Sequence, residues 1–136
     1  MLALKDSDPD HNQRRTHNAV MQDFKKLEVW QLAHRLALDV YRACDRRFST
    51  FPGLRAQTLR AAQSISSNIA EGSGSEGAEF VRYLKLSVKS SKELEKDLIL
   101  ARDLNALSAS SFAELDKGVD HVRRKLIALI RTVQGS

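Results

Sequence analysis

Apolar side chains recur at alternating spacings of four and three residues through most of the chain that follows residue 23. This spacing places them on one side of an α-helix, so it predicts amphipathic helices and leaves little material for strands. The most regular row begins at Phe80 and continues through Leu84, Ser87, Ser91, Leu94, Leu98 and Ala101. A second regular row, after Ser108 as a helix N-cap, consists of Phe112, Leu115, Val119, Val122, Leu126, Leu129 and Val133.

The first predicted helix begins near residues 24–27, continues to about residue 48, and has a wider apolar surface than the others. One row consists of Val29, Ala33, Leu36, Val40 and Ala43, and a second row beside it of Trp30, Ala37, Tyr41, Cys44 and Phe48. At ~100° per residue the two rows cover roughly 160° of the helix. Such a helix lies deep in a core or offers its surplus to another subunit. We favour a subunit interface that includes Trp30, Ala37 and Tyr41, because every helix of a four-helix bundle borders solvent.

Short connectors join the predicted helices. The segment "STFPG" ends the first helix, and Pro52 suits the opening turn of a second that runs to about Glu71. The positions predicted to face the core are Leu54 or Thr58, followed by Ala62, Ile65 and Ile69. The helix is predicted to end with the help of Gly72 and Gly74. Short connectors favour antiparallel neighbours, so residues 24–136 are predicted to form an all-α, up-down-up-down four-helix bundle. Helices that assemble only between chains are less favoured, because these connectors let the apolar rows meet within one chain.

Two small residues stand in the middle of the row that begins at Phe80. Ser87 and Ser91 make the row thin, which would let a facing backbone approach closely. Their hydroxyls are expected to bond to carbonyl groups within their own helix.

The start of the chain and its composition narrow the class of protein. Residues 1–23 mix charged and polar side chains without an apolar period and predict a flexible tail. The 136 residues are enough for one domain with its own core. Cys44 is the only cysteine, which excludes an intramolecular disulfide and suits a reducing cytosol. No run approaches the ~20 apolar residues of a membrane span, so a cytoplasmic protein without a membrane partner is expected.

Positive charge is arranged along the last two predicted helices. The net charge is +5 and the pI about 9.6, which favours an anionic partner. Opposite the apolar row lies a basic row of Arg82, Lys85, Lys89, Lys92 and Lys96, and the last helix adds Arg123, Arg124 and Arg131. Such rows neutralise nucleic-acid phosphates and release counterions. The alternative is an ordinary solvated face, because Glu79, Glu93 and Asp97 dilute the positive field.

No catalytic or metal-binding set is apparent. Asn68 and Glu71 are neighbours on one helical face, but no His, Cys or activated Ser completes a reaction site around them. They are assigned a structural role, in helix termination or a hydrogen bond between subunits. The segment "GSGSEG" follows a helix rather than a strand, so it is a poor nucleotide fingerprint. The histidines lack partners at metal-ligand spacing, and His34 is expected to pack near Trp30. We therefore expect no metal, no cofactor and no enzymatic activity.

Three segments carry a family resemblance: "FKKLEVWQLAHRLALDVY", "LRAQTLRAAQSISSNIAEGSG" and "EFVRYLKLSVKSSKELEKDLILARDLNALS". In this order they resemble the bacterial four-helix bundle proteins encoded in ribosomal RNA intervening sequences, from about Phe24 to Val133. The most specific matches are Leu27, Val29 and Trp30, then Asn68 to Gly72, then Phe80 and the run from Ser91 to Glu95. One departure is Ser66, where the family often has a proline; here the second helix keeps its backbone donor.

The resemblance implies a homo-oligomer, with five subunits as the number, and does not imply an enzyme. A related branch, the accessory proteins of diversity-generating retroelements, is similar in fold, forms basic pentamers and binds nucleic acid and a reverse transcriptase. By this analogy nucleic acid and a reverse transcriptase are candidate partners. Two hypotheses follow: a non-enzymatic oligomer that binds nucleic acid, such as structured RNA, through its outer basic faces, or a protein-interaction scaffold without direct nucleic-acid binding.

Overall fold

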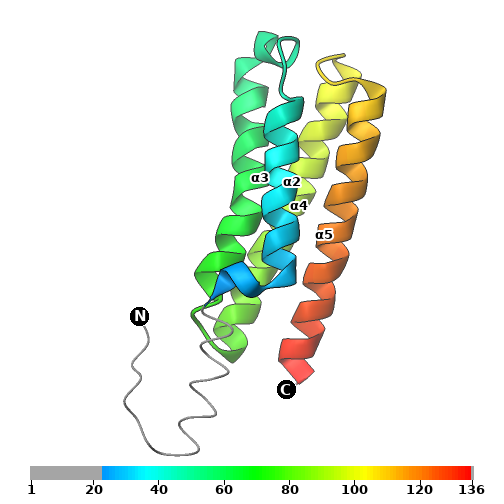
Figure 1. Ribbon diagram of the computed structural model, residues 1–136. Coiled ribbons are helices and arrows are strands. Elements are labelled where there is room, and N and C mark those ends of the chain that lie inside the picture. The colour runs from blue at the N-terminus through cyan, green and yellow to red at the C-terminus, as the bar shows by residue number, and fades with distance from the viewer. Residues whose placement is uncertain (1–22, 136) are drawn as a thin grey trace, which may run out of the picture.

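The computed structural model describes residues 23–135, and the tail predicted over residues 1–23 lies outside this range except for Asp23. The elements in chain order are η1 (Phe24–Lys26), α2 (Glu28–Ala43), η2 (Phe48–Thr50), α3 (Pro52–Gly72), α4 (Gly77–Asp103) and α5 (Ala109–Gly135). The four α-helices lie side by side and alternate in direction along the chain (Figure 1). The predicted up-down-up-down four-helix bundle is confirmed.

The core lies on the shared axis of the four helices. Each helix packs on the next one in the chain, and α5 closes the ring by packing on α2. All seven predicted inward positions of α4 are buried, including both serines. On α5 the central four of the predicted positions are buried, and Phe112, Leu129 and Val133 pack against the core from its edges. The heptad spacing thus identified the buried sides of both long helices.

The first predicted helix is wrong in its extent. Residues 24–26 form a short 3₁₀ turn, and α2 begins only after Leu27, whose backbone is extended. The helix ends at Ala43 rather than at residue 48. The Asp45 carboxylate accepts a hydrogen bond from the Arg47 backbone N–H at 3.0 Å, a local bond that competes with helix continuation. Phe48 is fully buried, but from the separate element η2.

Helix α3 begins with Pro52 as expected and continues through Ser66 without interruption. The helix ends at Gly72, within one residue of the predicted end, but Gly72 is its last helical residue and does not have the left-handed conformation of a glycine C-cap. A Cβ atom on Gly72 would lie 2.4 Å from the Tyr83 Cβ, so glycine is needed there for close packing between α3 and α4. The conformation that favours glycine occurs instead at Gly77, where φ is +57° at the start of α4.

The buried serines of α4 bond in two different ways. Ser91 Oγ donates to the Val88 carbonyl of its own helix at 2.6 Å, as predicted. Ser87 does not, because its Oγ donates across the interface to the Ile65 carbonyl of α3 at 2.9 Å. The prediction that Ser87 bonds to a carbonyl of its own helix is therefore wrong. The expected close approach of a facing backbone is confirmed. Ser108 caps α5 through a bond from the Ser111 N–H at 3.1 Å, also as predicted.

Candidate functional site

The outer face of α4 carries the predicted basic row. All five members are exposed: Arg82, Lys85, Lys89, Lys92 and Lys96. Arg82 is engaged by Glu79 at 2.9 Å, which raises the pKa of the Arg82 guanidinium, and Lys96 lies 4.0 Å from Asp97. Within residues 23–135 the three central lysines form no ion pair. Lys85, Lys89 and Lys92 together are called the lysine stripe below.

The acidic residues of α4 dilute the lysine stripe less than their number suggests. Glu95 is directed to α5, where Arg123 Nη2 donates to it at 2.8 Å. Asp97 is 1% exposed and faces α3, and Asp103 pairs with Arg102 at the end of the helix. Glu79 is held by Arg82, whose hydrogen bond lowers the pKa of the Glu79 carboxyl. Glu93 is the acidic side chain of α4 that stays exposed near the stripe without an ion pair to a described residue.

The three predicted arginines of α5 have different surroundings. Arg123 is only 18% exposed and bonds to Ser91 Oγ, to the Ser91 carbonyl and to Glu95, so it joins α5 to α4. Arg124 is exposed and pairs with Asp120 at 3.0 Å on its own helix. Arg131 is exposed about two helical turns after Arg124. The structure therefore does not gather these arginines into one basic site.

The predicted subunit interface lies along a shallow groove between α2 and α3. Trp30 stacks on His34 with ring centroids 4.8 Å apart and meets the edge of Phe24 at 4.9 Å. Tyr41, two turns after His34, is 46% exposed, whereas Ala37 is buried. These side chains and the facing surface of α3 enclose about 430 Å³. We call this the aromatic groove. The packing expected for His34 is present there.

Asn68 and Glu71 do not form a reactive pair. Asn68 Nδ2 donates to the Ser64 carbonyl at 2.9 Å and to Ser64 Oγ at 3.1 Å, so its amide is held against its own helix. Glu71 is exposed and has no ion pair with another described residue. Among residues 23–135, no cluster of three or more His, Cys, Asp or Glu side chains is placed to hold a metal ion.

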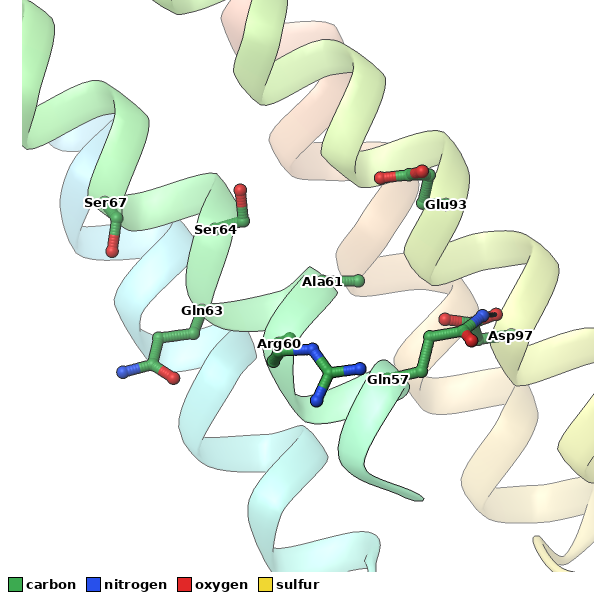
Figure 2. Close-up of a pocket in the computed structure, with 8 residues that line it drawn as sticks. All are labelled: Gln57, Arg60, Ala61, Gln63, Ser64, Ser67, Glu93 and Asp97. Carbon is green, nitrogen blue, oxygen red and sulfur yellow. Dashed lines mark hydrogen bonds between the residues drawn. The ribbon is translucent and has the colours of Figure 1, made fainter. Parts of the chain in front are cut away.

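One polar feature was missed by sequence reasoning. Asp97 was counted among the acids that dilute the basic row, but it lies buried beside a groove between α3 and α4 (Figure 2). The available signal was its spacing: Asp97 comes three residues after Leu94 and four before Ala101, both inward positions. Helical geometry therefore already placed this carboxylate at the edge of the core.

These features define a small four-helix bundle with a basic outer face on one long helix and an apolar groove beside another. The chain belongs to the 23S rRNA-intervening sequence protein family, whose model matches residues 25–128 and confirms the predicted resemblance. No curated protein matches the chain. Over residues 23–135, none of the helices combines the length and the apolar character needed to cross a bilayer.

Proposed function

We propose that this protein is a non-enzymatic homo-oligomer that binds nucleic acid through the lysine stripe of α4. The observation that carries the proposal is the state of Lys85, Lys89 and Lys92, which are exposed on successive turns and free of ion pairs within the described chain. Free ammonium groups neutralise phosphates without first giving up a protein partner. Structured RNA is the first nucleic acid to test, because the name of the family refers to an intervening sequence of 23S rRNA.

The geometry of α4 supports an extended contact. From Arg82 to Lys96 the basic row spans ~21 Å at ~1.5 Å per residue, comparable with the axial rise of about six nucleotides at ~3.4 Å each. Of the acids on α4 that would oppose such a contact, Glu79 and Glu95 are engaged by Arg82 and Arg123 and Asp97 is buried, which leaves Glu93 exposed beside the stripe. Of the α5 residues, Arg124 and Arg131 are exposed and can add phosphate contacts, whereas Arg123 contributes to the bundle.

The experiment compares RNA binding by the wild-type protein and a K85E/K89E/K92E variant over a range of salt concentrations. Fluorescence anisotropy with a labelled RNA hairpin would measure the affinity. Each phosphate contact contributes ~0.7–0.9 to the slope of log affinity against log salt, so loss of three contacts should reduce that slope by about two to three. We expect the affinity at moderate salt to fall roughly tenfold or more.

A matched control separates the lysine stripe from net charge. The variant K25E/K26E/K117E changes the charge by the same amount on other exposed surfaces. It should bind RNA more tightly than the stripe variant, and both should keep the helical circular dichroism of the wild type. Equal losses in the two variants would mean that affinity follows total charge, and undiminished binding by the stripe variant would contradict the proposal.

A second candidate function is a protein-interaction scaffold, and the aromatic groove favours it. Trp30 and Tyr41 keep part of their apolar surface accessible beside α3. Aromatic side chains of this kind are enriched at protein interfaces. We propose this groove as the contact between subunits, with five subunits as the number implied by the resemblance. A scaffold without nucleic-acid binding would show no salt-dependent affinity for RNA in the experiment above, and sedimentation velocity of the same sample would still show an oligomer.

A further inference from the structure

The outer edge of the α3–α4 interface is open and polar. This groove has a volume of about 540 Å³. In Figure 2, Gln57 reaches from α3 to Asp97 on α4, whereas Gln63 and Ser67 point away from α4. Gln57, Arg60, Ser64 and Ser67 line it from α3, and Glu93 and Asp97 from α4. A volume of this size falls within the ~300–1,000 Å³ of ordinary small-ligand pockets. We call it the Asp97 groove.

The Asp97 carboxylate is the unusual group in this groove. Its side chain is 1% exposed, and Oδ1 accepts a hydrogen bond from Gln57 Nε2 at 2.7 Å. Oδ2 is also buried but receives no hydrogen bond within the described chain. A buried acceptor without a donor is unfavourable and rare in folded proteins. Oδ2 therefore marks a position where an additional donor would be stabilised.

The surroundings specify the chemistry of that donor. Lys96 Nζ is 4.0 Å from Oδ1, beyond hydrogen-bond range, and its side chain is 68% exposed. Glu93, one turn before Asp97, adds a second negative charge to the same wall. Two carboxylates disfavour an anion, and no cluster of three metal-ligating groups is present among the described residues. Arg60 on the opposite wall disfavours a ligand with several positive charges.

We propose that the Asp97 groove binds a guanidinium group, which donates N–H bonds to Asp97 Oδ2 and has Glu93 as a second anionic neighbour. A guanidinium carries one delocalised charge and several N–H donors in a planar fork that matches a carboxylate. Ala61 and the methylene groups of Gln57 offer apolar contact to the chain that bears the guanidinium. This inference does not rest on nucleic-acid binding, because it is argued from the carboxylates of the groove, although Glu93 and Lys96 place the groove next to the basic row.

Gln57 controls access to Asp97 in this arrangement. Its exposed side chain crosses from α3 to the carboxylate on α4, and in Figure 2 the two groups lie against each other. When the Gln57 side chain turns toward solvent, Oδ1 loses its donor and can accept a hydrogen bond from the ligand, as Oδ2 does. The groove thus binds its ligand by exchanging a neutral amide donor for a charged donor, which forms the stronger hydrogen bond.

The guanidinium can belong to a small molecule or to an arginine side chain of a second copy of this chain. The chemistry at Asp97 is the same in both cases. A first experiment uses ethylguanidinium as the probe and follows the full-length protein by ¹H–¹⁵N NMR, with the Gln57 side-chain amide and the Ala61 and Asp97 backbone amides as reporters. We expect saturable shifts of these signals and small changes elsewhere.

Variants decide whether Asp97 is the partner. D97N keeps the shape but removes the charge, and should weaken binding by about tenfold or more. D103N removes a carboxylate from the exposed end of the same helix and should bind as the wild type does. Sodium chloride at equal ionic strength should not reproduce the shifts. Equal affinity of D97N and wild type, equal shifts with sodium, or no saturable shift would overturn the proposal.

Two further measurements test the access step and the source of the ligand. Q57A frees Oδ1 as well, so it should bind ethylguanidinium at least as tightly as the wild type, and weaker binding would overturn the role given to Gln57.

Sedimentation velocity then compares self-association of wild type and D97N. Weaker self-association of D97N, with competition by ethylguanidinium, assigns the guanidinium to a second copy. Unchanged self-association together with binding of the probe assigns it to a small molecule.

Discussion

Helix α3 packs against α4 on one side and against α2 on another, and the two interfaces are closed in different ways. Against α4 the contacts are made by small residues: Gly72 lies against Tyr83, Ser87 bonds to the Ile65 carbonyl, and the Ser64 and Ser90 hydroxyls meet at 2.8 Å. Against α2, large rings stand beside α3 and leave the aromatic groove of about 430 Å³. Small residues let the backbones of α3 and α4 approach in the interior of their interface and leave the polar Asp97 groove only at its outer edge, whereas the partly exposed rings beside α2 leave apolar surface for another molecule.

The largest effect on stability is expected from Gly72→Ala, at a close contact between α3 and α4. The added Cβ would lie 2.4 Å from the Tyr83 Cβ and 3.2 Å from a Phe80 ring carbon, so the helices must separate or shift. Such overpacking costs ~1–3 kcal/mol in the free energy of unfolding. Urea unfolding followed by circular dichroism at a fixed protein concentration would measure it.

Gly53→Ala is the matched control for that substitution. Nothing lies within 4 Å of a Cβ at Gly53, on the first turn of the same helix. Replacing a compatible glycine reduces the entropy of the unfolded chain, so a gain of up to ~1 kcal/mol is expected. If both substitutions had the same effect, close packing at Gly72 would not explain how the α3–α4 interface is held.

A smaller loss is expected from Ser87→Ala, which removes the hydroxyl that joins α4 to the Ile65 carbonyl. The bond is fully buried, and its net contribution should be ~1 kcal/mol. Ser67→Ala removes an exposed hydroxyl from the α2 side of α3 and should stay within about ±0.5 kcal/mol of the wild type. Thermal unfolding of the two variants in parallel would test whether hydroxyl groups stabilise only the closely packed interface.

The fold could be predicted from sequence because burial in helices follows a fixed angular period. The inward positions of α4 are spaced by four and three, and all of them are buried. The end of α2 was not predictable in this way. Tyr41, Cys44 and Phe48 have helical spacing, but the Asp45 carboxylate bonds to the Arg47 N–H and turns the chain. Periodicity does not detect such local bonds, which compete with a helix without changing the apolar pattern.

The candidate surfaces were only partly predictable, because the role of a charged residue depends on its neighbours in space. Arg123 and Lys89 are both basic residues on long helices, yet Arg123 is held by Ser91 and Glu95 while Lys89 is free of ion pairs within the described chain. Asp97 has the spacing of a core-edge position, but spacing does not reveal that Gln57 bonds to Oδ1 while Oδ2 has no donor within the described chain. Spacing therefore located these groups and left their partners undetermined.

The pH dependence of stability should distinguish the polar edge of the α3–α4 interface from its packed interior. Burial raises the pKa of Asp97, and the hydrogen bond from Gln57 and the charge of Lys96 only partly oppose this shift. The folded protein thus holds the proton more tightly than the unfolded chain, so ionisation of Asp97 lowers stability as the pH rises above its usual pKa of ~3.9. The charged groups around it are Lys96 and Glu93 on α4 and Arg60 on α3.

D97N removes this titration and should become more stable relative to the wild type as the pH increases from about 4 toward neutral. Urea midpoints of the two proteins across that range would measure the difference. D103N, at the exposed end of α4, retains Asp97 and should follow the wild-type profile. Parallel profiles for D97N and wild type would show that burial of Asp97 has no energetic consequence in the intact bundle.

The smallest effect on unfolding is expected from Tyr41→Ser, on α2 at the aromatic groove. Tyr41 is 46% exposed, so its removal should change the free energy of unfolding of a single subunit by no more than about 0.5 kcal/mol. Self-association should respond far more, because a tyrosine in a buried interface contributes enough to change the dissociation constant by roughly tenfold or more. Sedimentation velocity over a concentration series would measure this, with Leu100→Ser on α4, where the side chain is 48% exposed, as the control. If Leu100→Ser impaired assembly and Tyr41→Ser did not, the subunit contact would lie on α4, and the aromatic groove would not be the contact between subunits.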